Sequence, residues 1–187
     1  MLTRRDLVKW GLASVALPAM AGGGGALASS VSPLHKMVFD GRLPASRIFG
    51  ARAQKLGAPI AVIHGDVTAL WFHDLHFLWQ SGSRAAVAGL TRPSSLFALE
   101  QMALLAGRRV VFRAEHHEQA AGNYTHRVAT PSGFATLADR SPDWAAHMAQ
   151  AMVQNIAPVS NHLQAHAMMA APASDRHVLV SWIIAAV

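Results

Sequence analysis

The sequence predicts an α/β fold with three layers, in which a mostly parallel sheet of about four strands is extended by antiparallel strands toward the C-terminus. Short apolar runs rich in β-branched residues, such as residues 60–63, are typical of strands that are covered on both faces. Helical stretches separate these runs, which favours parallel pairing through right-handed crossovers. The polar residues that end successive strands also recur at nearly constant spacings of 26, 25 and 24 residues, at Asp40, Asp66, Thr91 and Glu115.

The first unit joins a short strand at residues 37–42 to a helical stretch at residues 44–56. The strand ends in polar residues that include Asp40 and Arg42. Gly57 follows the helical stretch, as glycine commonly follows the last turn of a helix.

The second unit joins the strand at residues 60–63 to a helix at residues 67–80, and Gly65 lies between them. Asp66 and Thr68 carry side-chain oxygens that can accept hydrogen bonds from the free N–H groups of a first helical turn. The plainest interpretation of both residues is therefore helix capping.

The third unit joins a strand that begins at Ala85 to a helix at residues 93–106. Proline at the first position of this helix and Gly107 after its last position follow the usual asymmetry of helix ends. The fourth strand comprises residues 109–113 and is followed by Ala114 and the polar residues 115–117.

The C-terminal half has a different pattern. Residues 124–129 and 133–138 flank the turn sequence Thr-Pro-Ser at 130–132, which predicts a hairpin. A helix is expected from Ser141 to about Asn155, and a final strand at residues 177–186.

The first 28 residues carry a targeting pattern: Thr-Arg-Arg-Asp-Leu-Val-Lys at 3–9, an apolar stretch at 10–21 and Ala-Leu-Ala at 26–28. The pattern resembles a bacterial twin-arginine (Tat) signal peptide. The resemblance implies recognition by the Tat export machinery, cleavage after Ala28, and a location in the periplasm or outside the cell. The remaining residues, 29–187, are long enough for a single domain. A chance arginine pair on a cytoplasmic protein, or an uncleaved anchor, is the alternative. Because the Tat route carries folded proteins, the resemblance also motivates a search for a cofactor or partner.

Composition removes several classes of site. The chain has no cysteine, which excludes disulfides, thiolate zinc sites, cysteine-ligated iron–sulfur clusters and a cysteine nucleophile. The formal net charge is +6, but the arginines are scattered, so we expect no nucleic-acid interface. No apolar run reaches the roughly 18 residues of a membrane span, so we expect none in the mature chain.

Polar residues follow every predicted parallel strand, and open parallel sheets bind ligands outside the carboxyl ends of their strands. We expect Asp40, Arg42, Thr68, Thr91 and Arg92 to bind a ligand or cofactor there. Two arginines and two helix N-termini would suit a carboxylate or phosphate group. As a catalytic set at the same edge we expect Asp66, Glu115 and His116, with His64 or His116 assisting Asp66. Caps and solvated loops are the alternative explanation of all these residues.

A metal site is a further hypothesis, because the chain has eleven histidines. His73 and His76 lie three residues apart on a predicted helix, and His162 and His166 lie four apart, so each pair shares a helical face. Solvent-facing histidines are the preferred explanation of both spacings, and we assign no metal ligand. No nucleotide-binding or hydrolase motif is present in the mature part.

The leading functional hypothesis is an exported domain that binds a small molecule or cofactor at the carboxyl edge of its parallel strands. A hydrolase, or a metal-dependent enzyme with histidine and carboxylate ligands, is the second hypothesis. An accessory subunit of an exported enzyme complex, with no active site of its own, is the third. The pattern identifies neither the ligand nor the cofactor.

Overall fold

The computed structural model describes residues 33–119, 123–130, 133–137, 141–154 and 178–187. The signal-peptide pattern at residues 1–28, the turn at 131–132 and the pair His162 and His166 lie outside the described residues.

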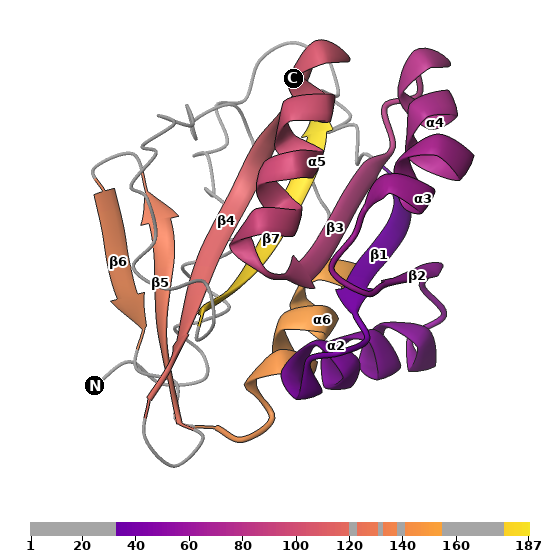
Figure 1. The fold of residues 1–187 in the computed structure, drawn as a ribbon. Helices are drawn as coiled ribbons and strands as arrows, with labels where there is room; N and C mark the ends of the chain where they lie inside the picture. The colour runs from indigo at the N-terminus through magenta and orange to yellow at the C-terminus, as the bar shows by residue number, and fades with distance from the viewer. Residues whose placement is uncertain (1–32, 120–122, 131–132, 138–140, 155–177) are drawn as a thin grey trace, which may run out of the picture.

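One seven-stranded sheet forms the middle layer, with the strand order β2-β1-β3-β7-β4-β5-β6 (Figure 1). Strand β1 pairs in parallel with β2 and β3, and the remaining pairs are antiparallel. The fold is therefore α/β, as the sequence predicts. The strands are β1 (Leu34–Asp40), β2 (Ile60–Ile63), β3 (Ala86–Thr91), β4 (Arg108–Glu118), β5 (Tyr124–Thr130), β6 (Gly133–Leu137) and β7 (Val178–Ala186).

The last strand lies inside the sheet. Strand β7 pairs antiparallel with β3 on one side and with β4 on the other, so β4 runs in the same direction as β1, β2 and β3. The four predicted strands thus share one direction, but β7 separates the fourth from the third. Residues 178–185 are all buried, as expected of a strand covered on both faces. Among the antiparallel strands, only β5 and β6 extend the sheet outward.

Helices cover both faces of the sheet (Figure 1). On one face, α2 (Pro44–Lys55) packs against α6 (Trp144–Gln154). On the other face lie α3 (Thr68–Leu70), the π-helical turn η1 (Trp71–Leu75), α4 (His76–Gln80) and α5 (Pro93–Leu105). Within the described part of the chain, no helix has the length and apolar character needed to cross a membrane.

Alternating side chains of the strands divide the core in two. Met37 of β1 and Leu179 of β7 pack with α2 and α6, whereas Val38 of β1 and Trp182 of β7 pack with η1, α4 and α5. This alternation follows from the two-residue period of a strand, and it determines which face each polar residue of the sheet occupies.

Candidate functional site

The connections that leave β1 and β3 turn to opposite faces of the sheet. Helix α2 follows β1 and packs on one face, while α5 follows β3 and packs on the other, although the two strands are neighbours. Such a reversal opens a crevice at the carboxyl ends of the two strands, and α/β proteins commonly bind ligands there. The switch point lies between residues 40–42 and 91–93.

An ion pair occupies the β1 side of the switch point. Arg42 donates from Nε to Oδ1 of Asp40 at 3.0 Å and from Nη2 to Oδ2 at 2.7 Å. The Asp40 side chain is 0% exposed, whereas the Arg42 side chain is 48% exposed, so the pair presents its cationic partner to solvent. The backbone N–H of Arg42 also donates to Asp40 Oδ1 at 3.0 Å.

Positive charge holds Asp40 in its ionised form. Burial alone would raise the pKa of this carboxyl group. Hydrogen bonds from the side chain and backbone of Arg42, with the charges of Arg42 and Arg92, outweigh burial and lower the pKa below its usual value. Asp40, Arg42 and Arg92, which the sequence assigns to one edge, therefore interact electrostatically in the structure.

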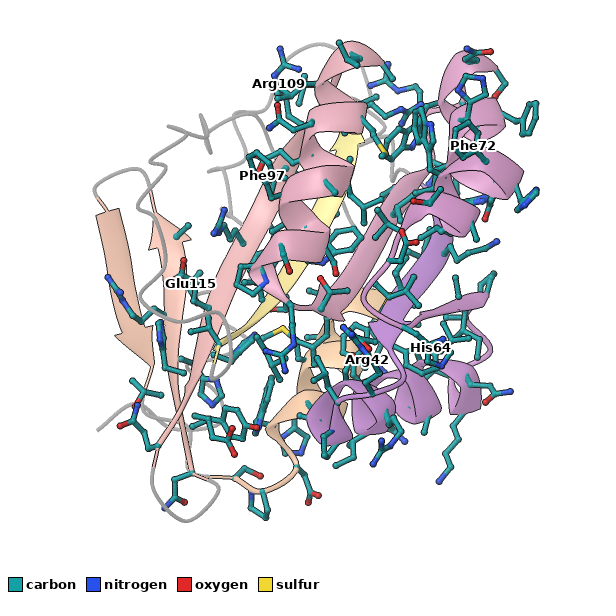
Figure 2. All side chains as sticks on the ribbon, viewed as in Figure 1. Arg42, His64, Phe72, Phe97, Arg109 and Glu115 are labelled. Atoms are coloured by element: carbon teal, nitrogen blue, oxygen red, sulfur yellow. The ribbon has the colours of Figure 1, made fainter. Side chains whose placement is uncertain are left out.

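Arg42 also reaches the end of β2. A Cβ atom built on Gly65 would overlap the Arg42 guanidinium group, so the guanidinium lies directly over the Gly65 backbone. The His64 ring lies near Gly41, the residue before Arg42, because a Cβ on Gly41 would lie 3.1 Å from His64 Nε2. Figure 2 shows Arg42 and His64 as neighbours at this edge of the sheet.

On the β3 side, the Thr91 and Ser95 side chains form hydrogen bonds within the protein. The Thr91 hydroxyl accepts a hydrogen bond of 3.0 Å from Trp182 Nε1 and donates to the carbonyl of Arg92 at 3.1 Å. Ser95, in the first turn of α5, donates to the Gly65 carbonyl at 3.2 Å. Helix α5 begins at Pro93, and no side chain caps its first turn. Thr91 is fully buried, so its hydrogen bonds fix the end of β3, and its side chain is not available to a ligand from solvent.

Asp66 and Thr68 form a turn at the surface. The Asp66 carboxylate accepts a hydrogen bond of 2.8 Å from the backbone N–H of Thr68, where α3 begins. Hydrogen bonds from the Thr68 side chain and backbone lower the pKa of Asp66 below its usual value. Asp66 therefore accepts a hydrogen bond from the first residue of α3, as predicted. The Thr68 side chain does not accept from a helix N–H group in this way, but donates to the Asp66 carboxylate.

Glu115 lies within β4, because the strand continues to Glu118 instead of ending before residue 114. Thr91 and Glu115 are each directly opposite Val180, so they occupy one row of the sheet, two strand spacings or about 10 Å apart. Arg113 lies 3.4 Å, His117 3.3 Å and Arg127 3.9 Å from the Glu115 carboxylate. Figure 2 shows Glu115 on the other side of α5 from Arg42. The charged partners of Glu115 therefore come from β4 and β5, and not from the strands of the switch point.

His116 faces the opposite side of the sheet from Glu115 and is fully buried against Trp144 of α6, with ring centroids 4.4 Å apart. Three strands separate β4 from β2, after which Asp66 follows, so the two strands lie about 19 Å apart in the sheet. Asp66 is exposed, whereas His116 is buried. Asp66, Glu115 and His116 are not brought together as one catalytic set.

The sequence indicates neither partner of His116. Its Nδ1 lies 2.7 Å from Nδ1 of His126, and its Nε2 lies 2.8 Å from Oγ of Ser181. Ser181 is 65 residues away in sequence, and its strand has an otherwise apolar pattern. A lone serine in such a strand is a weak signal for a buried polar partner.

A search of the described residues for groups of three or more histidine, aspartate or glutamate side chains able to hold a metal ion finds none. His73 and His76 belong to η1 and α4, and the His76 ring contacts Trp71 edge-on at 5.2 Å. Comparison of the chain with protein-family models, curated proteins and solved structures finds no match.

Proposed function

We propose that this chain is an exported α/β protein that binds a small ligand through a carboxylate or phosphate group at the switch point between β1 and β3. The observation that carries the proposal is the reversal of the chain connections at this point, with Arg42 on one side and Arg92 on the other. Sites of this kind are the usual ligand position in open α/β sheets.

The charge of the edge supports an anionic ligand. The guanidinium groups of Arg42 and Arg92 both act electrostatically on the buried carboxylate of Asp40, so two cationic side chains lie at this edge. Arginine presents a planar set of N–H donors that matches carboxylate and phosphate oxygens. The first turn of α5 adds backbone N–H groups of Ser94 and Ser95 beside Arg92, and a helix N-terminus also favours negative charge.

Binding is favoured over catalysis by the placement of the acidic and imidazole groups. Asp66 is exposed beside β2, Glu115 is ion-paired on β4, and His116 is buried on the other face. A general acid or base must lie within hydrogen-bond reach of the reacting group. The three residues therefore do not form a common centre.

A titration followed by NMR tests the binding site. The mature chain, residues 29–187, would be titrated with inorganic phosphate and then with malonate at constant ionic strength. We expect saturable shifts of the backbone N–H signals of residues 92 and 94–96, and their loss in the Arg92→Gln variant. The control Arg84→Gln removes the same charge just before β3, at the opposite edge of the sheet, and should leave the titration unchanged. Equal responses of both variants, or shifts spread over the whole surface, would contradict the site.

Export is tested separately. Expression of the full chain in a bacterium with a Tat system should place a folded product beginning at Ser29 in the periplasm. Replacement of both Arg4 and Arg5 by lysine should retain the precursor inside the cell. Periplasmic product from the lysine variant would argue against the twin-arginine route.

A further inference from the structure

A buried chain of polar groups crosses three strands of the sheet on the face covered by α6. His126 of β5 contacts His116 of β4 through their Nδ1 atoms at 2.7 Å, and His116 Nε2 contacts Ser181 Oγ of β7 at 2.8 Å. Ser181 and His116 are 0% exposed and His126 is 4% exposed. Trp144 at the start of α6 packs on both imidazole rings, with centroid distances of 4.4 and 4.9 Å.

The Nδ1 contact restricts the number of protons in the chain. A hydrogen bond between two Nδ1 atoms needs one N–H and one lone pair, so one proton lies between the rings. When both imidazoles are protonated, both Nδ1 atoms carry hydrogen and the bond is lost. When only His116 is protonated, both hydrogen bonds remain, but a full charge is placed where the side chain has no solvent contact.

The elements around the pair contribute few groups that would offset such a charge. Strands β6 and β7 contain no titratable residue. Helix α6 and the turn before it contribute His147, which is half-buried, and Asp143, which is exposed. Strand β5 contributes Tyr124, stacked 6.3 Å from His126, and Arg127, which pairs with Glu115. On β4, Glu115 and His117 pair with each other. Burial, followed by the charge of the exposed Glu118, raises the pKa of Tyr124. Burial, followed by the charges of His126 and His117, holds the pKa of His116 well below its usual value.

We propose that His116, His126 and Ser181 form an acid-sensitive clasp that holds α6 and β5 against β7 and releases them when the pH falls. A histidine in an opened segment titrates near pH 6.5. Because the pKa of His116 is lower in the closed state, the closed state is fully favoured above about pH 6.5 and loses stability as the pH falls below that value. Each proton taken up on opening changes the opening equilibrium up to about tenfold per pH unit.

Hydrogen exchange of the mature chain between pH 8 and pH 5, corrected for the intrinsic pH dependence of exchange, tests the clasp. We expect the protection factors of amides in β5 and the first turns of α6 to fall up to tenfold per pH unit below about 6.5. Amides that pair β1 with β3 should keep their protection over the same range. Equal losses in both regions, or no loss in β5 and α6, would overturn the proposal.

Two variants separate titration from packing. His116→Gln replaces the buried imidazole, whose pKa is lowered, with an amide that can still donate or accept, and it should flatten the pH dependence in β5 and α6. His73→Gln, at an exposed position of η1, should retain the wild-type dependence. An unchanged pH dependence in His116→Gln would contradict the clasp. Should this variant fail to fold, the exchange profile of the native chain decides the question alone.

Discussion

The indole Nε1 of Trp182 donates a hydrogen bond of 3.0 Å to the hydroxyl of Thr91, and both side chains are fully buried. The bond joins the residue that ends β3 to the centre of β7. The edge that carries the candidate site is therefore anchored by a strand that arrives last in the sequence.

Replacement of Thr91 by valine should destabilise the protein by about 1–3 kcal/mol, because the buried Trp182 N–H loses its acceptor. Valine preserves the shape of threonine, so packing changes little. Thr91→Ser keeps the acceptor and removes only a methyl group, which should cost roughly 1 kcal/mol. Urea unfolding of the two variants measures the difference; a loss in Thr91→Val no larger than that in Thr91→Ser would mean that the hydrogen bond from Trp182 contributes little to stability.

Gly65 provides a test of the contact between the β2 end and Arg42. Its φ of 86° lies in the left-handed region, and a Cβ there would overlap the Arg42 guanidinium. Gly65→Ala should therefore combine backbone strain of roughly 1–2 kcal/mol with displacement of Arg42 from its position against Asp40.

Gly82→Ala is the matched control, since Gly82 has a φ of 71° and a Cβ atom added there would meet no other group within 4 Å. Its cost should be limited to the backbone strain. Unfolding free energies should rank the Gly65 variant as the less stable, and phosphate-induced NMR shifts should be lost only in that variant. Equal stability and equal shifts would mean that Arg42 accommodates the added methyl group.

Asp74 connects η1 to β1. Its carboxylate accepts a hydrogen bond of 2.8 Å from His35 Nε2 and forms an ion pair with Lys36. Asp74→Asn should lower the unfolding free energy by about 1–3 kcal/mol, because charge-assisted hydrogen bonds exceed neutral ones. Asp143→Asn, at an exposed position, removes the same charge and should change stability little. Comparable losses in both variants would point to net charge as the cause.

Local pattern was sufficient to predict the strand–helix units. Strands β1 and β3 are short and apolar because helices cover both faces, and Pro93 and Gly107 mark the ends of α5 as expected. The expectation that residues 60–63 are also covered on both faces is wrong, because β2 is the edge strand and Val62 is 52% exposed. The same pattern predicts that Asp40 and Thr91 end adjacent strands, and the register places them side by side: Phe39 pairs with Leu90 one residue earlier.

The local sequence pattern does not predict which strands pair with each other in the sheet. Nothing local in the apolar strand β7 indicates that it inserts between β3 and β4, because any buried position in the sheet would suit it. The end of β4 was also misplaced, since charged residues after Arg113 resemble a strand end. In the structure they alternate, with Glu115 ion-paired on one face and His116 buried on the other. Consequently the predicted edge retains Asp40, Arg42 and Arg92, while His116 belongs to a different face.

The ionised state of Asp40 predicts a specific response to acid. Because the pKa of Asp40 is lower in the folded protein than its unfolded value near 3.9, its contribution to stability is present above about pH 4 and is lost as the pH falls through the folded pKa. Asp40→Asn should therefore be less stable than the wild type at pH 7 and should show a shallower loss of unfolding free energy between pH 4 and pH 2. The exposed Asp143→Asn variant should follow the wild-type curve. Chemical denaturation at each pH measures both slopes, and parallel curves for wild type and Asp40→Asn would show that Arg42 and Arg92 do not stabilise the buried carboxylate.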